Sequence, residues 1–145
     1  MSDIKTSKLI KSAIYYAYVK HKGQLDDNGK SYFTHHLLPV GTIVAMLTTD
    51  EEVIAAAYLH DVLEDTNATY KKLQELFGEK VAALVNELTH EGSKDEHGYY
   101  FPRLKSKDAV MIKMIDRASN LSRMECWDVK RRAQYLRKSK FWNHE

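Results

Sequence analysis

Apolar residues recur at helical spacing along most of the chain. In the first expected helix, from about residue 4 to 20, Ile10, Ala13, Ile14 and Ala17 repeat at steps of three and four positions. No segment shows the sustained alternation of apolar and polar residues that is typical of a strand, and only two prolines interrupt the chain. The pattern therefore predicts an all-α protein.

The same spacing, together with capping residues, predicts six further helices. They cover Thr34 to about Leu47, with Thr34 as the cap; TTDEEV through Asp65; TNATYKKLQELFG, ending at Gly78; EKVAALVNELTH; Ser106 to about Met124; and DVKRRAQYLRKS. Residues 91–105 are the one long irregular stretch, and no internal repeat appears. We therefore expect residues 1–145 to form a single domain, a helical bundle.

Composition narrows the class of protein. Lys and Arg number 22 against 20 Asp and Glu, so the net charge of +2 favours neither a nucleic-acid binder nor an acidic tail. Cys126 is the single cysteine, which excludes an intrachain disulfide and a cysteine-based zinc cluster. No apolar segment has the length of a signal peptide or a membrane span. We expect a soluble, cytoplasmic protein without a nucleic-acid or membrane partner; protein partners are not predicted.

The segment 58–66, YLHDVLEDT, concentrates ionisable residues in an apolar region. On a continuous helix His60, Asp61, Glu64 and Asp65 fall within an arc of about 140°. One interpretation is the charged end of an ordinary amphipathic helix. Carboxylates near a helix C-terminus oppose the helix dipole, however, and a divalent cation would offset that repulsion. Imidazole and carboxylate ligands suit manganese, iron or zinc.

Further ligands would have to come from elsewhere in the chain. His35 and His36 begin the second predicted helix, and in IKMIDRASNL Asp116 and Asn120 lie four residues apart on one helix face. Each feature has an ordinary explanation as well. The histidines can be surface residues, and Asp116 can pair with a neighbouring cation, Lys113 or Arg117.

These motifs together resemble those of a known family. HKGQ, GKSYFTHH, AAAYLHDVLEDT, FGEKVAALVNELT and IKMIDRASNL, in this order, resemble the HD-domain phosphohydrolases of the RelA/SpoT type, in particular the small alarmone hydrolases. The resemblance runs from about residue 10 to 125 and implies a helical bundle with a central metal site. It implies one divalent ion, most often Mn²⁺, with the ligands His35, His60, Asp61 and Asp116. His36 stands where the family generally has proline, so His35 is the expected ligand.

The resemblance also implies an activity and the residues that perform it. The reaction is hydrolysis of the 3′-pyrophosphate of guanosine tetra- or pentaphosphate, giving GDP or GTP and pyrophosphate. Glu64 and Asp65 match the catalytic acids, and Asn120 matches a residue that contacts the nucleotide. Lys113 and Arg117 can offset substrate charge. The alternatives are hydrolysis of another nucleotide (an adenosine analogue, NADPH or a nucleoside monophosphate) and a catalytically silent binding module.

The loop after HKGQ departs from the family pattern. Asp26 and Asp27 occupy the positions where the family usually has an Arg-Lys pair beside the purine. A carboxylate only accepts hydrogen bonds, so it can pair with the N1–H and 2-amino donors of guanine but not with adenine N1. We therefore expect Asp26 and Asp27 either to contact the base or to belong to a solvated turn that touches no ligand.

Overall fold

The computed structural model describes residues 7–89, 104–124 and 126–138. Its elements are α1 (Lys8–Lys20), a π-helix (Phe33–Leu37), α2 (Leu38–Leu47), α3 (Glu51–Tyr58), α4 (Val62–Asp65), α5 (Tyr70–Phe77), α6 (Glu79–Leu88), α7 (Lys107–Leu121) and α8 (Val129–Lys138). Within these residues there is no strand, only an isolated bridge between Leu25 and Ser31. The all-α prediction is confirmed. Most of the expected irregular stretch, 91–105, lies outside the described residues.

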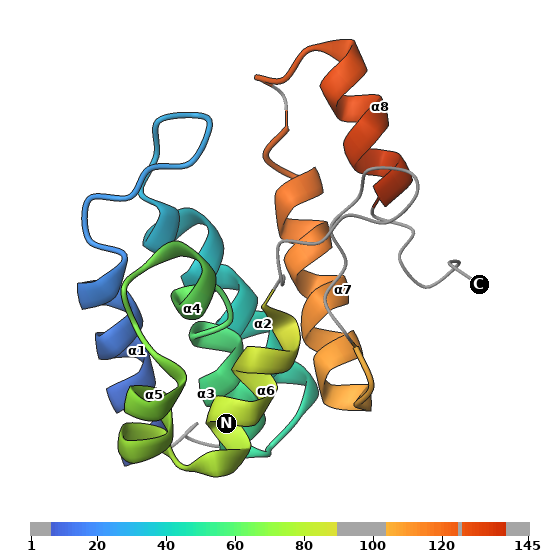
Figure 1. The fold of residues 1–145 in the computed structure, drawn as a ribbon. Helices are drawn as coiled ribbons and strands as arrows, with labels where there is room; N and C mark the ends of the chain where they lie inside the picture. The colour runs from blue at the N-terminus through green and yellow to red at the C-terminus, as the bar shows by residue number, and fades with distance from the viewer. Residues whose placement is uncertain (1–6, 90–103, 125, 139–145) are drawn as a thin grey trace.

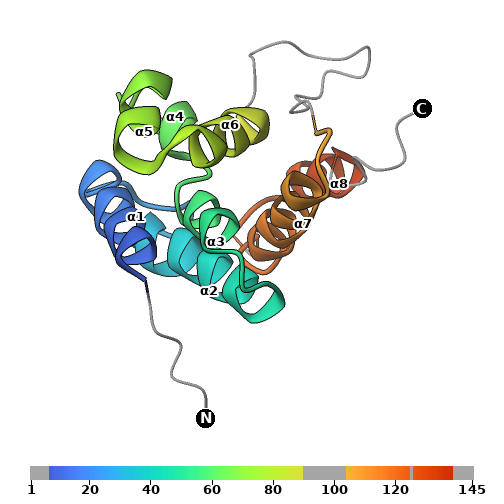
Figure 2. The same ribbon diagram turned by 90° about the horizontal axis from the view of Figure 1, so that it is seen from below.

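Helix α3 lies between α1, α2 and α6 (Figures 1 and 2). All its residues from Val53 to Tyr58 are buried, so this helix is enclosed rather than amphipathic. Its contact with α2 is close, because a Cβ atom on Gly41 would come within 2.2 Å of the Tyr58 ring. Only glycine fits there, and this close approach holds the start of α2 near the end of α3.

The predicted third helix is interrupted. α3 ends at Tyr58 and α4 begins at Val62, with Leu59 and Asp61 in a turn conformation near φ −100° and ψ 2°. The His60 N–H bonds to the Ala57 carbonyl, three residues back, and the His60 ring bonds to the same carbonyl. The expectation of one continuous helix through Asp65 is therefore wrong. His60 and Asp61 instead lie in a tight connection between two helices.

The predicted second helix begins differently from the expectation. Thr34 is not its cap, because the backbone is already helical at Tyr32 and the first turn is π-helical, with the Leu38 N–H bonding to the Phe33 carbonyl. His36 and Leu37 are fully buried, whereas His35 is exposed. Within this π-helical turn His36 therefore faces inward and His35 outward.

Helix α7 lies beside α2 and α6, and α8 lies near the C-terminal end of α7 (Figure 1). Ser106 caps α7 by accepting the Ala109 N–H, and the Glu87 carboxylate of α6 accepts bonds from the Ser106 N–H and hydroxyl. These bonds fasten the start of α7 to the end of α6. In the part of the chain described, no helix is long and apolar enough to cross a membrane.

Candidate metal centre

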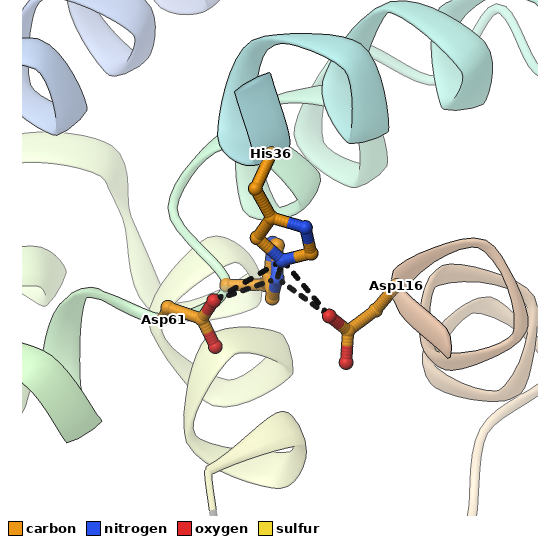
Figure 3. A group of neighbouring side chains, drawn as sticks. His36, Asp61 and Asp116 are labelled. Atoms are coloured by element: carbon orange, nitrogen blue, oxygen red, sulfur yellow. Dashed lines mark hydrogen bonds and ion pairs between the residues drawn. The ribbon is translucent and has the colours of Figure 1, made fainter. Parts of the chain in front are cut away.

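Four side chains from three parts of the chain meet at one point. His36 comes from the π-helical turn, His60 and Asp61 from the connection between α3 and α4, and Asp116 from α7. Figure 3 shows the His36 ring, the Asp61 carboxylate and the Asp116 carboxylate pointing toward one another from separate elements. One ligand atom from each of the four residues lies within 4.8 Å of the others. Segments up to 80 positions apart (36 to 116) therefore build one site.

The distances between these atoms fit a common central ion. His36 Nε2 lies 3.2 Å from His60 Nε2, 3.4 Å from Asp61 Oδ2 and 3.0 Å from Asp116 Oδ1. His60 Nε2 lies 3.1 Å from Asp61 Oδ2 and 3.3 Å from Asp116 Oδ1. Ligand atoms about 2.1 Å from one metal ion are about 3.0–3.4 Å apart when they subtend 90–109° at the ion. The measured separations fall in that range.

The hydrogen bonds on the far side of each ring also suit metal binding. The Nδ1 of His60 donates to the Ala57 carbonyl at 2.7 Å, so in the neutral ring Nε2 carries the lone pair. The Nδ1 of His36 lies 2.8 Å from Ser119 Oγ, which can accept a hydrogen bond from Nδ1–H when His36 is in the same tautomer. The two Nε2 atoms, 3.2 Å apart, thus face each other and two carboxylate oxygens, an arrangement that a cation between them would stabilise. The donor set is consistent with a divalent metal.

Burial and the charges of neighbouring side chains set the pKa values of the cluster residues. Burial alone would lower the pKa of His60, but the neighbouring Asp61 and Asp116 outweigh it and hold that pKa well above 6.5. Burial likewise would raise the pKa of Asp61 and of Asp116, yet the cationic neighbours, His60 for Asp61 and Lys113 for Asp116, help to hold both well below 3.8. The carboxylates are therefore ionised and available as ligands.

The structure brings His36, not His35, into the cluster. His35 is exposed, and its Nδ1 lies 3.2 Å from the Ser31 carbonyl. The expectation of His35 as ligand is therefore replaced by His36, while His60, Asp61 and Asp116 lie where the sequence placed them. The spacing along the sequence could have indicated that His36 is buried, because it lies four and eight residues before Val40 and Val44, which are both fully buried.

Tyr32 is a residue of the site that the sequence did not suggest. Its hydroxyl donates to Asp61 Oδ2 at 2.5 Å, and its ring centroid lies 5.0 Å from that of His36. Burial, with the charge of Asp61, raises the pKa of Tyr32 far above 10, so the phenol stays protonated and keeps donating. Tyr32 thus orients an oxygen of the cluster. Its position four residues before His36 is the only signal the sequence offers.

Glu64 and Asp65 lie on α4, immediately after the turn that carries His60 and Asp61. Both are exposed. Gln24 donates through Nε2 to Asp65 Oδ2 at 3.2 Å, and its Oε1 lies 2.7 Å from His21 Nδ1. Desolvation, with the nearby charges of Asp61 and Glu64, raises the pKa of Asp65 to about 6. Asp65 is therefore a carboxyl group that can exchange a proton near neutral pH.

The raised pKa of Asp65 predicts a stability effect in the metal-free protein. Because the folded-state pKa of about 6 exceeds the unfolded value, the folded state binds more protons, and stability falls as the pH rises through about 4 to 6. At pH 7 Asp65→Asn should therefore raise the free energy of unfolding, by about 0.5–1 kcal/mol once solvent screening of an exposed group is allowed for. Urea unfolding at pH 7 and pH 4 checks this, since the gain should vanish at pH 4.

Lys113 and Arg117 are both buried on α7. Lys113 Nζ pairs with Asp116 Oδ2 at 3.2 Å. Asp116 therefore has both a cationic partner on its own helix, as the ordinary explanation expected, and a place in the cluster. The Arg117 guanidinium lies 5.2 Å from the centroid of the Tyr135 ring. Among the described residues its Nε and Nη2 atoms are buried without a hydrogen-bond partner. A buried cation with open donors is suited to an anionic ligand.

The carboxylates of Asp26 and Asp27 have protein partners. Asp26 Oδ1 accepts the Asn28 and Lys30 N–H groups, and its Oδ2 lies 3.2 Å from Arg123 Nη1. Asp27 Oδ2 accepts from Trp127 Nε1 at 2.7 Å and from Arg131 Nη2 at 2.6 Å. Both oxygens of Asp26 and one oxygen of Asp27 thus have protein partners, and contact of these acids with the base stays a prediction. Asp26 does belong to a turn, but its side chain is buried rather than solvated, and both acids fasten the loop to residues 123–131.

Asn120 lies beside the cluster. Its Nδ2 is 3.4 Å from Asp116 Oδ1 and 2.7 Å from the Tyr135 hydroxyl, and its Oδ1 accepts from Arg123 Nη2 at 2.6 Å. The four-residue spacing of Asp116 and Asn120 was therefore a correct indication that they share a face of α7. The structure connects Asn120 directly to a cluster carboxylate.

Comparison with known proteins identifies relatives that match most of this chain. The chain matches the model of the HD domain over residues 13–97. It is 30% identical to guanosine-3′,5′-bis(diphosphate) 3′-pyrophosphohydrolase MESH1 of Drosophila melanogaster, over 94% of this chain and 83% of that protein. It is 34% identical to the bifunctional (p)ppGpp synthase/hydrolase SpoT of Escherichia coli (strain K12), over 79% of this chain but 18% of SpoT.

A solved structure shows the same arrangement of helices. It is that of a metazoan ortholog of SpoT that hydrolyzes ppGpp, and it has a TM-score of 0.79 and 33% sequence identity, over 92% of this chain and 83% of that one. The fold, the sequence match and the cluster of two histidines and two aspartates all point to the same family. The chain therefore belongs to the HD domain family and is a homologue of MESH1 and SpoT.

Proposed function

We propose that this protein is a metal-dependent hydrolase that removes the 3′-pyrophosphate of guanosine 3′,5′-bis(diphosphate) and its pentaphosphate analogue, giving GDP or GTP and pyrophosphate. The buried cluster of His36, His60, Asp61 and Asp116 carries the proposal, because it is a preformed ligand set in a chain similar to MESH1 over 94% of its length. The proposal takes residues 1–145 to act as one domain.

The four cluster residues would hold one divalent ion, and we infer that Mn²⁺ serves best. The set combines imidazole nitrogen with carboxylate oxygen and contains no thiolate, which suits manganese better than a soft ion. When bound, such an ion lowers the pKa of a coordinated water and polarises phosphoryl oxygens. The chain's own contribution is to fix the ligands, through the Ala57 carbonyl, Ser119 and Tyr32.

Glu64 and Asp65 are the proposed proton-transfer groups. They lie within one helical turn of Asp61 on α4, and both are exposed, so that a substrate and water can reach them. With its pKa raised to about 6, Asp65 can hold or release a proton near neutral pH. We assign to these two carboxyl groups the orientation of the attacking water and delivery of a proton to the leaving oxygen.

The negative charge of the substrate phosphates would be stabilised by cationic side chains of the protein. We propose that Arg117 and Lys113 face the phosphates, because both are buried on α7, the helix that carries Asp116, and Arg117 presents donors without partners in the described structure. Lys113 would act while still paired with Asp116. Asn120 is the proposed nucleotide contact on the same helix.

The activity is tested with a nucleotide panel. Purified protein with Mn²⁺ is incubated separately with guanosine tetraphosphate, its adenosine analogue, NADPH, GTP and GMP, and products are separated by anion-exchange chromatography. We expect turnover of guanosine tetraphosphate to exceed that of the others. Preferential cleavage of another member of the panel would establish a different nucleotide phosphohydrolase, and no cleavage of any member would favour a silent binding module.

A further inference from the structure

A continuous chain of side-chain contacts runs from the loop that follows α1 to the cluster. Asp26 Oδ2 lies 3.2 Å from Arg123 Nη1, and Arg123 Nη2 donates to Asn120 Oδ1 at 2.6 Å. Asn120 Nδ2 in turn lies 3.4 Å from Asp116 Oδ1, the oxygen that faces both histidines. Asp26 and Asp116 are thus connected through two intermediate side chains.

The hydrogen-bond chemistry of Arg123 fixes which way the Asn120 amide points. A guanidinium only donates, so the amide oxygen must face Arg123. The amide nitrogen is then left on the other side, where it donates to Asp116 Oδ1 and to the Tyr135 hydroxyl. With the amide reversed, its carbonyl oxygen would face the Asp116 carboxylate, and two acceptors would repel each other. Arg123 therefore selects the orientation that stabilises the Asp116 carboxylate.

Arg123 is itself held on several sides. The Asp26 side chain is 2% exposed and is fixed by the backbone N–H groups of its own turn. Asn28 of the same turn donates through Nδ2 to the Arg123 carbonyl at 3.2 Å. The Arg123 guanidinium also lies 6.0 Å from the centroid of the Tyr32 ring, whose hydroxyl donates to Asp61. One arginine thus contacts a supporting residue of each cluster aspartate.

We propose that Asp26 and Arg123 are positioning residues, which set the orientation of Asn120 and thereby hold the Asp116 carboxylate in place as a metal ligand. The inference rests on the proposed metal site. It gives the acidic loop a function other than contact with the base: Asp26 holds the arginine that orders the ligand shell. Hydrogen-bonded partners of metal ligands typically change metal affinity or activity about 10–100-fold when they are lost.

The test is Mn²⁺ affinity, measured by isothermal titration calorimetry, which does not depend on any substrate. Arg123→Met keeps an aliphatic stem but removes the donors, so we expect Mn²⁺ affinity to fall about tenfold, the lower end of the range for such partners. Lys80→Met is the matched control, because it also removes a cation from an ion pair, with Asp50 at 2.8 Å, but far from the cluster. That variant should bind Mn²⁺ as the wild type does.

A charge-reversed double variant, Asp26→Arg with Arg123→Asp, separates orientation from simple attachment of the loop. It restores an ion pair between the loop and position 123, just after α7, but aspartate there cannot donate to Asn120 Oδ1, so we expect Mn²⁺ affinity to stay low. Recovery of wild-type affinity would overturn the proposal. Asp26→Asn, which leaves the arginine donors in place, should give a smaller decrease and serves if Arg123→Met does not fold.

The possible results also distinguish this inference from the proposed function. Unchanged Mn²⁺ affinity in Arg123→Met, with a wild type that binds Mn²⁺, overturns the positioning role alone. Failure of the wild type to bind any divalent ion overturns the metal site and this inference together. Absence of alarmone hydrolysis by a wild type that binds Mn²⁺ overturns the proposed function. The Mn²⁺ affinities of the variants still test the positioning role in that case.

Discussion

Replacing His36 with alanine should abolish tight binding of a divalent metal and all metal-dependent hydrolysis, whereas His35→Ala should leave both close to wild type. The Nε2 of His36 lies 3.0–3.4 Å from the ligand atoms of His60, Asp61 and Asp116, so its loss opens one side of the cluster. His35 is exposed on the same turn. We expect metal affinity to fall at least about 100-fold in His36→Ala, the upper end of the effects seen for groups that only support a ligand.

Metal content after dialysis, measured by inductively coupled plasma mass spectrometry, distinguishes the two histidines. Because His36 is fully buried, thermal unfolding of both metal-free variants is measured alongside, to separate loss of a ligand from loss of the fold. Added Mn²⁺ should raise the unfolding temperature of wild type and His35→Ala but not that of His36→Ala. Metal loss in His35→Ala with retention in His36→Ala would reverse the assignment.

Glu64→Gln should retain the metal while turnover falls about 10²–10⁴-fold, the range of general acid–base contributions. Glutamine keeps the size of the side chain but removes both the base and its charge. Glu64 lies on α4, outside the group of converging ligand atoms, so the cluster does not need it to bind the ion. Asp65→Asn should behave in the same way.

Steady-state kinetics on guanosine tetraphosphate, combined with metal analysis of the same samples, measures this effect. We expect kcat to fall and metal content to stay at the wild-type level. Loss of metal from Glu64→Gln would make Glu64 a ligand, and unchanged kcat would remove it from catalysis.

The helical class and most of the cluster could be predicted from the sequence because both depend on local pattern. Apolar spacing indicated the helices, and His60, Asp61 and Asp116 stood out as ionisable residues in apolar segments. The break at 59–61 was missed because its apolar spacing is compatible with a continuous helix. It arises instead from the turn in which the backbone and ring of His60 both bond to the Ala57 carbonyl.

Other parts of the site depend on contacts between distant segments. His35 was preferred to His36 on the family pattern, although the spacing of His36 from Val40 and Val44 indicated a buried side chain, and only the fold shows that the His36 ring meets His60, Asp61 and Asp116. The partners of Asp26 and Asp27 lie about 100 positions away, at Arg123, Trp127 and Arg131. Composition shows that these acids are present, but only the fold shows that they are already paired.

Hydrolysis of guanosine tetraphosphate in ¹⁸O-labelled water, followed by ³¹P NMR and mass spectrometry of the products, tests the central claim most directly. With Mn²⁺ present we predict GDP and pyrophosphate as the only products, and no reaction after chelation until Mn²⁺ is restored. Equal turnover by metal-free protein, or release of phosphate from the 5′ side with the 3′-pyrophosphate intact, would contradict the account.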